Sequence, residues 1–145
     1  MGVRAGFTEI SPDIFEQVVA GAEPETTGGV HHSIDKAWND FHLVFRSKGP
    51  PLNSAIAGDY RHSLSPHSLD EFCEGHHEYY VGFVSPHLVG EIAKVLVNIT
   101  AADYKRWERE LVGDQYNCGE TFFPELKAAY AEAAARKSAL MIVIC

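Results

Sequence analysis

The sequence predicts an α+β fold, in which a small mixed sheet is packed by about five to six helices in one compact domain. Three short segments rich in β-branched or aromatic residues lie at the start, the centre and the end of the chain. Between them lie amphipathic segments that begin with residues favoured at helix N-termini. The length of 145 residues suits a single domain over residues 1–145 and allows a sizeable buried core.

The three segments at the start, centre and end are expected to be strands. At the start, Val3, Ala5 and Phe7 alternate with other residues, as in a half-buried strand. Residues 79–84 combine aromatic and β-branched side chains. Residues 139–145 are wholly apolar, which is typical of a strand covered on both faces. The C-terminal strand is therefore expected in the interior of the sheet, with helices on both sides.

Capping residues indicate where most of the helices begin. Ser11-Pro12 and Ser85-Pro86 each place proline directly after an N-cap serine, and Thr100 with Asp103 resembles a capping box. Further helices are expected from Pro124 onward and, in a short form, over residues 52–57, whereas residues 59–75 are polar and irregular. The buried faces expected for the three capped helices are Ile14, Phe15, Val18 and Val19; Leu88, Val89, Ile92, Ala93 and Leu96; and Tyr104, Trp107, Leu111 and Val112.

Residues 34–45 predict one more helix, capped by Ser33, whose apolar positions 34, 37, 38, 41 and 45 share a face. Two titratable residues seven positions apart lie roughly on one side of it. An aromatic stripe edged by such groups is the nearest approach to a site in the sequence. The candidate pocket residues are Asp35, Trp38 and His42, with Tyr80 from the central strand.

A structural interpretation of the same residues competes with the functional one and is favoured. Asp35 would lie in the first helical turn, where a carboxylate interacts well with the helix dipole. His42 would be a boundary residue hydrogen-bonded to backbone. As a general base, His42 would instead need an acceptor on its second nitrogen and a pocket in front of it.

Composition excludes several classes of function. Twelve basic and twenty acidic residues give a formal charge of −8 without any basic stripe, so neither nucleic acid nor an anionic membrane is an expected partner. No apolar run approaches the roughly 20 residues of a membrane span. A basic protein partner stays open. Cys73, Cys118 and Cys145 form no Cys-x-x-Cys pair, which fits free thiols in a reducing cytoplasm.

Residues 71–78 include Glu71, Cys73, Glu74, His76, His77 and Glu78, and so every common type of metal ligand. They lack His-x-x-x-His spacing, and a solvated polar loop is the simpler interpretation, so we expect no metal and no cofactor. The neighbouring carboxylates would raise the pKa of the Cys73 thiol, which argues against a nucleophile. The phosphate-binding and nucleophile-elbow motifs do not occur either.

Several short patterns occur along the chain in a set order. They are Phe7-Thr8-Glu9-Ile10-Ser11, Ile34-Asp35-Lys36-Ala37-Trp38 followed by His42-Leu43, Pro51-Leu52 with Ala55-Ile56 and Gly58, Tyr80-Val81, the helix over 88–96, Leu126 with Tyr130, and the apolar C-terminal strand. Together they span essentially the whole chain and resemble the DUF1877, or YfbM-like, family of bacterial proteins. The resemblance implies a compact α+β domain. It carries over no catalytic residue, because the family is named for lacking an assigned activity.

Without an ordered catalytic constellation, the sequence favours a cytoplasmic, non-enzymatic binding or protein-interaction domain. The alternative is a small hydrolase or transferase with a pocket over the Trp38 helix. In that enzyme His42 would be the base, Asp35 the orienting acid and Tyr80 a hydroxyl contributor. Its site should be concave and lined with aromatic residues.

Overall fold

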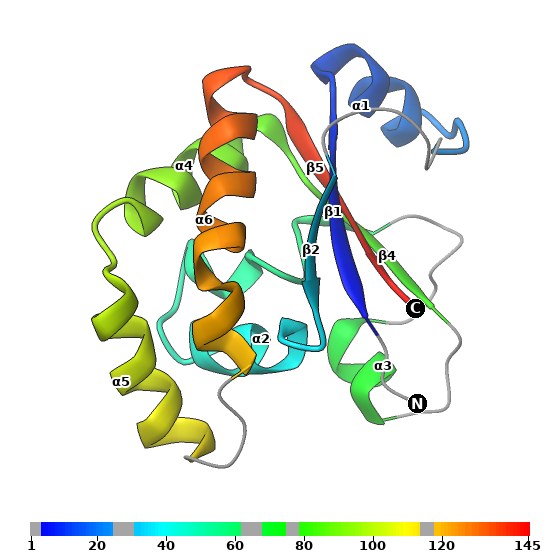
Figure 1. Cartoon of the computed structure of the whole chain (residues 1–145). Helices are drawn as coiled ribbons and strands as arrows, with labels where there is room; N and C mark the ends of the chain where they lie inside the picture. Colours follow the sequence, from blue (N-terminus) through cyan, green and yellow to red (C-terminus); the bar gives the residue numbers. More distant parts are fainter. Residues whose placement is uncertain (1–3, 25–30, 62–67, 75–78, 114–117) are drawn as a thin grey trace.

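A five-stranded sheet in the order β2-β1-β5-β4-β3 organises the fold (Figure 1). The structure, a computed structural model, describes residues 4–24, 31–61, 68–74, 79–113 and 118–145. The pairings between the described strands are all antiparallel, so the α+β class is confirmed but the sheet is not mixed. The strands are β1 Ala5–Ile10, β2 His31–Asp35, β3 Tyr60–Arg61, β4 Tyr80–Val84 and β5 Ala139–Ile144.

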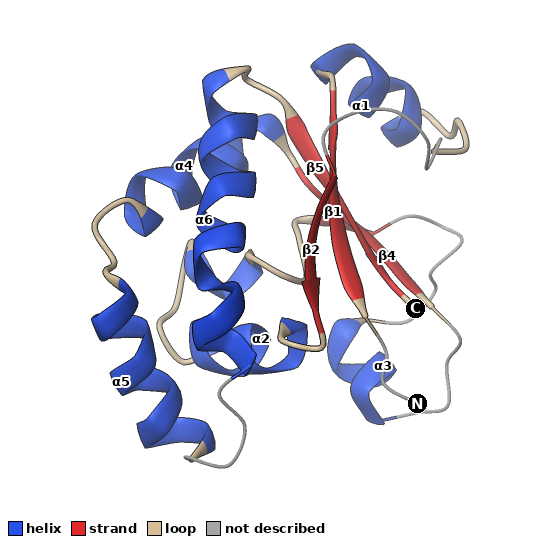
Figure 2. Ribbon diagram, in the orientation of Figure 1, coloured by secondary structure: helices blue, strands red, loops and turns tan. Residues whose placement is uncertain are grey.

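The helices agree in number with the prediction (Figure 2). The described segments form α1 Pro12–Val19, α2 Trp38–Arg46, α3 Leu69–Glu74, α4 Pro86–Leu96, α5 Ala101–Val112 and α6 Cys118–Ala135, with a 3-10 turn η1 at Leu52–Ser54. Ser11 and Ser85 cap α1 and α4, and the capping box at Thr100 opens α5, as predicted. Within the described ranges, no helix has the length and apolarity needed to cross a bilayer.

Strand β5 lies at the centre of the sheet, between β1 and β4, as expected. Leu140, Ile142 and Ile144 join the main core with α2, α4 and α6, whereas Ala139 and Met141 belong to a smaller cluster that includes Val18 of α1. Figure 1 shows α1 near one end of the sheet, on the side opposite α4 and α6. Among the described residues, helices therefore cover one face well and the other only at its α1 end, which corrects the expectation of full cover on both faces.

The segment before Trp38 also differs from the prediction. Ile34 and Asp35 belong to β2, and α2 begins only at Trp38, so Ser33 caps no helix. Ile34 is fully buried, and a single buried position fits a strand period as well as a helical one. The pairing of β2 with β1 decides between them, because it requires an extended backbone at residues 31–35.

Other helices keep their type but differ in bounds or burial. Ile14 and Val19 of α1 are exposed at 45% and 47%, since α1 packs on the sheet through Phe15 and Val18. Leu111 of α5 is also exposed. Helix α6 begins at Cys118, six residues before the expected Pro124. The described parts of the 59–75 region form β3 and α3. Of the candidate metal stretch, His76, His77 and Glu78 lie outside the described residues, as do the side chains of Cys73 and Glu74.

Candidate binding site

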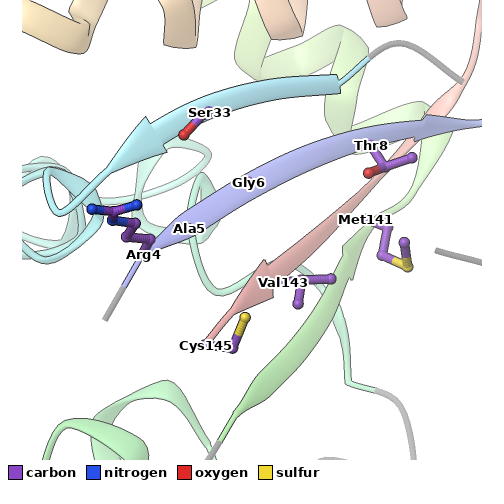
Figure 3. A pocket seen from close by; sticks show the side chains of 8 residues that line it. All are labelled: Arg4, Ala5, Gly6, Thr8, Ser33, Met141, Val143 and Cys145. Atoms are coloured by element: carbon purple, nitrogen blue, oxygen red, sulfur yellow. The ribbon is translucent and has the colours of Figure 1, made fainter. Parts of the chain in front are cut away.

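The sheet face opposite the main helices carries a groove of about 350 Å³ across β2, β1 and β5 (Figure 3). This volume lies within the range of small-molecule sites, roughly 300–1,000 Å³. The groove is lined by Arg4, Ala5, Gly6, Thr8, Ser33, Met141, Val143 and Cys145.

Strand register explains why the groove forms there. Gly6 is paired with Ser33 of β2 on one side and with Val143 of β5 on the other. Side chains at paired positions project from the same face, and glycine projects none. The row Ser33, Gly6, Val143 is therefore hollow in its middle, and α1 covers only the far end of this face.

An unusual local geometry stands at one end of the groove. The register of β1 with β2 shifts between Ala5 and Gly6, and Asp35 opposite adopts a left-handed backbone with φ 48°. The Asp35 carboxylate lies 3.1 Å from Nε of Arg4, whose side chain is 71% exposed. Two backbone hydrogen bonds of 2.9 Å join Arg4 to Cys145. Of the predicted site residues, Asp35 thus lies beside the groove and positions one of its lining side chains.

The other predicted residues lie around α3. Trp38 packs edge-on against Phe72 at 5.9 Å between ring centroids, and Phe72 packs against Tyr80 at 6.2 Å. The Tyr80 hydroxyl donates to the carbonyl of Ala57, and burial raises the pKa of Tyr80 to about 12. Trp38 and Tyr80 therefore share a neighbour, with α3 packed over them. Tyr80 also lines a separate pocket of about 290 Å³ that includes Asp59 and Arg61.

His42 is 5% exposed and anchors α3 to α2. Its Nε2 lies 3.1 Å from Oδ1 of Asp70, and Nη1 of Arg46 lies 2.7 Å from the same oxygen. The hydrogen bond to His42, followed by the charges of His42 and Arg46, lowers the pKa of Asp70 although burial opposes it. Asp70 is 28 residues away from His42 in sequence, so no local pattern could have revealed this pair.

A second histidine ties β2 to α6 on the face away from the groove. Nδ1 of His32 lies 2.6 Å from Glu125, and Nε2 lies 2.6 Å from Glu132. Both nitrogens face acceptors, so the ring makes both hydrogen bonds only when it is protonated. Burial lowers the pKa of His32, but these carboxylates outweigh it and the pKa is raised. Next to them, Arg136 makes two bonds of 2.7 Å to Glu9.

A buried carboxyl lies between α5 and the start of α6. Glu108 is 2% exposed, and neither of its oxygens nor the Tyr104 hydroxyl has a hydrogen-bond partner among the described residues. Any side chain at Gly119 would collide with both groups. Burial raises the pKa of Glu108, and the negative charge of Asp40 adds to the rise. The arrangement favours a neutral, protonated carboxyl.

Replacement of Glu108 by glutamine is therefore expected to stabilise the protein at high pH. Because the folded pKa is raised above 4.5, the contribution of Glu108 to stability is full below about pH 4.5 and is lost as pH rises through the folded pKa. At pH 8, Glu108→Gln should gain about 1–3 kcal/mol over wild type, and this gain should shrink toward pH 4. Urea unfolding across pH measures it. The exposed Glu110→Gln is the control, and equal pH profiles for the two variants would contradict the assignment.

Comparison with known proteins places the whole chain in one family. The family model described as "Domain of unknown function (DUF1877)" matches residues 1–143. The crystal structure of YfbM from Escherichia coli, a protein of unknown function, is similar with a TM-score of 0.63 and 15% sequence identity, over 98% of this chain and 99% of that one. No curated protein matches. The chain belongs to the DUF1877 family, and its likeness to YfbM shows a shared fold.

Proposed function

We propose that this DUF1877 domain is a non-enzymatic binding domain of the cytoplasm, and that the groove across β2, β1 and β5 holds its ligand. The observation that carries the proposal is the hollow row of Ser33, Gly6 and Val143 on a sheet face that α1 covers only in part. Concave apolar surfaces of this size are the usual form of small-molecule sites.

The chemistry of the lining favours binding over catalysis. Its hydroxyls, Thr8 and Ser33, and its thiol, Cys145, have no imidazole among the lining residues that the structure describes, and the side chain of His31, the strand partner of Thr8, lies outside that description. A nucleophile of this kind needs an adjacent base to react. The nearby carboxylate, Asp35, is paired with Arg4.

The enzymatic alternative has one observation in its favour, the hydrogen bond between His42 and Asp70. A carboxylate that orients an imidazole is a common feature of acid–base catalysis. However, His42 is only 5% exposed, and Asp70 is also paired with Arg46. The pair is better explained as the joint between α2 and α3.

A ligand screen by NMR tests the binding proposal. We expect small apolar fragments to shift the backbone amide signals of Gly6, Thr8 and Val143. Ser33→Trp adds a large side chain at an exposed strand position next to Gly6, and it should abolish these shifts with no loss of folding. The matched control is Val97→Trp, which places the same side chain at a 70% exposed position following α4.

Two outcomes would overturn the proposal. In the first, the fragments shift amide signals that lie outside the groove. In the second, fragments bind the Ser33→Trp variant as tightly as they bind the Val97→Trp control. If shifts appear only when a second protein is added, the groove serves a protein partner in place of a small ligand, and the small-ligand form is wrong.

A further inference from the structure

We infer that the groove selects ligands that carry a single carboxylate on an apolar body, with the carboxylate held by Arg4. This inference rests on the proposed function, because it names the class of ligand that the groove takes. It follows from the position of Arg4, from its pairing with Asp35 and from the apolar surface that continues away from it.

Arg4 is the one cationic side chain among the groove's described lining residues. Its backbone is fixed by two hydrogen bonds to Cys145, and its Nε faces Asp35 at 3.1 Å. A guanidinium presents five N–H donors in a planar fork, and the ion pair with Asp35 lies on its Nε side, where Oδ1 of Asp35 accepts no hydrogen bond from the described residues. The two terminal nitrogens are left to take a carboxylate end-on, with two parallel hydrogen bonds.

Asp35 preorganises the Arg4 side chain for binding an anion. Its left-handed backbone and the register shift opposite place the carboxylate against Nε of Arg4. An arginine held at one nitrogen loses less side-chain entropy when it binds an anion than a free one does. Figure 3 shows Arg4 at one end of the groove, near Ser33, with Val143 and Met141 along β5.

The remainder of the groove suits an apolar body of limited length. From Arg4 to Thr8 the floor spans four strand positions, or about 13 Å. Along it lie the gap at Gly6 and the side chains of Val143 and Met141, and Met141 and Thr8 are themselves buried. A medium-chain aliphatic or an aromatic carboxylate fits these dimensions.

Charge limits the head group to one negative charge. The chain carries a formal charge of −8, and Asp35 lies within 3.1 Å of the guanidinium that would bind the ligand. A dianion such as a phosphate monoester would meet more repulsion than Arg4 can offset. The structure therefore favours a monocarboxylate over a phosphate.

Three probes with the same eight-carbon chain test the inference: octanoate, 1-octanol and octylammonium. Titration at constant ionic strength, followed by NMR, gives the affinity of each for wild type and for variants. We expect octanoate to bind at least about 10-fold more tightly than octanol, with octylammonium weakest. Arg4→Gln should remove the preference for octanoate, and the control Lys94→Gln, at an exposed position on α4, should leave it unchanged.

Asp35→Asn provides an opposite test, because asparagine also tolerates a left-handed backbone. The asparagine side chain keeps an oxygen beside Nε of Arg4 but removes the negative charge that competes with the ligand, and since the lost repulsion is larger than the lost ordering of Arg4, octanoate should bind several-fold more tightly. Equal binding of octanoate and octanol to wild type, or a preference that persists in Arg4→Gln, would overturn the choice of ligand class while groove binding stands. Failure of all three probes to perturb the groove, together with a failed fragment screen, would overturn the proposed function itself.

Discussion

Deletion of residues 140–145 is expected to leave no cooperatively folding protein. These residues form most of β5, which is hydrogen-bonded to β1 on one side and to β4 on the other. Leu140, Met141, Ile142 and Ile144 are each at most 1% exposed. Each such side chain contributes about 1.5–3 kcal/mol when buried, against a total stability of about 5–15 kcal/mol for a domain. Circular dichroism and thermal unfolding of the purified product measure the outcome.

A pair of single substitutions gives the same test at finer scale. Ile142→Ala removes a side chain that faces the main core and should cost about 2–5 kcal/mol. Val143→Ala, at the next position on the same strand, faces the groove and is half-buried, so its cost should be clearly smaller. Equal costs would mean that the two faces of the sheet are packed alike. A deletion product that still unfolds cooperatively would show that β5 is not essential to the sheet.

The sequence was most informative where a structural element leaves a local chemical pattern. N-cap serine followed by proline marked the starts of α1 and α4, because both the cap hydrogen bond and the proline backbone angle are local properties. The apolar run at the C-terminus predicts an interior strand for a similar reason, and β5 is buried at each of its positions except the half-buried Val143, although Cys145 after it is exposed.

The prediction from sequence is wrong where one spacing of apolar residues fits both a helix and a strand. Ile34 continues the helical spacing of Trp38 and Phe41, yet it also alternates with Ser33 and Asp35 as a strand residue does. Only the pairing of β2 with β1 separates these possibilities, and pairing is a property of two distant segments. Proline favours the first turn of a helix, so the sequence places the start of α6 at Pro124, whereas Pro124 lies inside a helix that begins at Cys118.

The same limit applies to the candidate site. The groove depends on Gly6 standing between Ser33 and Val143, and no one segment of sequence contains that row. Of the predicted residues, Asp35 lies beside the groove, but it does so at the end of a strand and not in a helical turn. In the extended backbone of β2, Ser33 and Asp35 lie on one face of the sheet and His32 and Ile34 on the other.

Trp38→Ala is expected to destabilise the protein by about 3–5 kcal/mol. Trp38 is 8% exposed and packs on Phe72, so its loss leaves a cavity between α2 and α3. The remaining joint of these helices, His42 with Asp70, involves an exposed carboxylate and cannot compensate for the lost packing. Urea unfolding measures the cost. Faster amide exchange in α3 than in α4 would locate the damage.

A comparison with Trp107→Ala distinguishes core packing from a general effect of losing an indole ring. Trp107 is only partly buried and holds Lys48 over its ring at 4.1 Å, so its truncation should cost much less. Because Trp38 lies on the helix side of the sheet, Trp38→Ala at low temperature should bind groove ligands as wild type does. The opposite result would be a Trp38→Ala variant whose free energy of unfolding is within about 1 kcal/mol of wild type but which has lost ligand affinity. That result would identify Trp38 as the floor of a pocket, and the enzymatic site over α2 would then replace the groove as the proposed site.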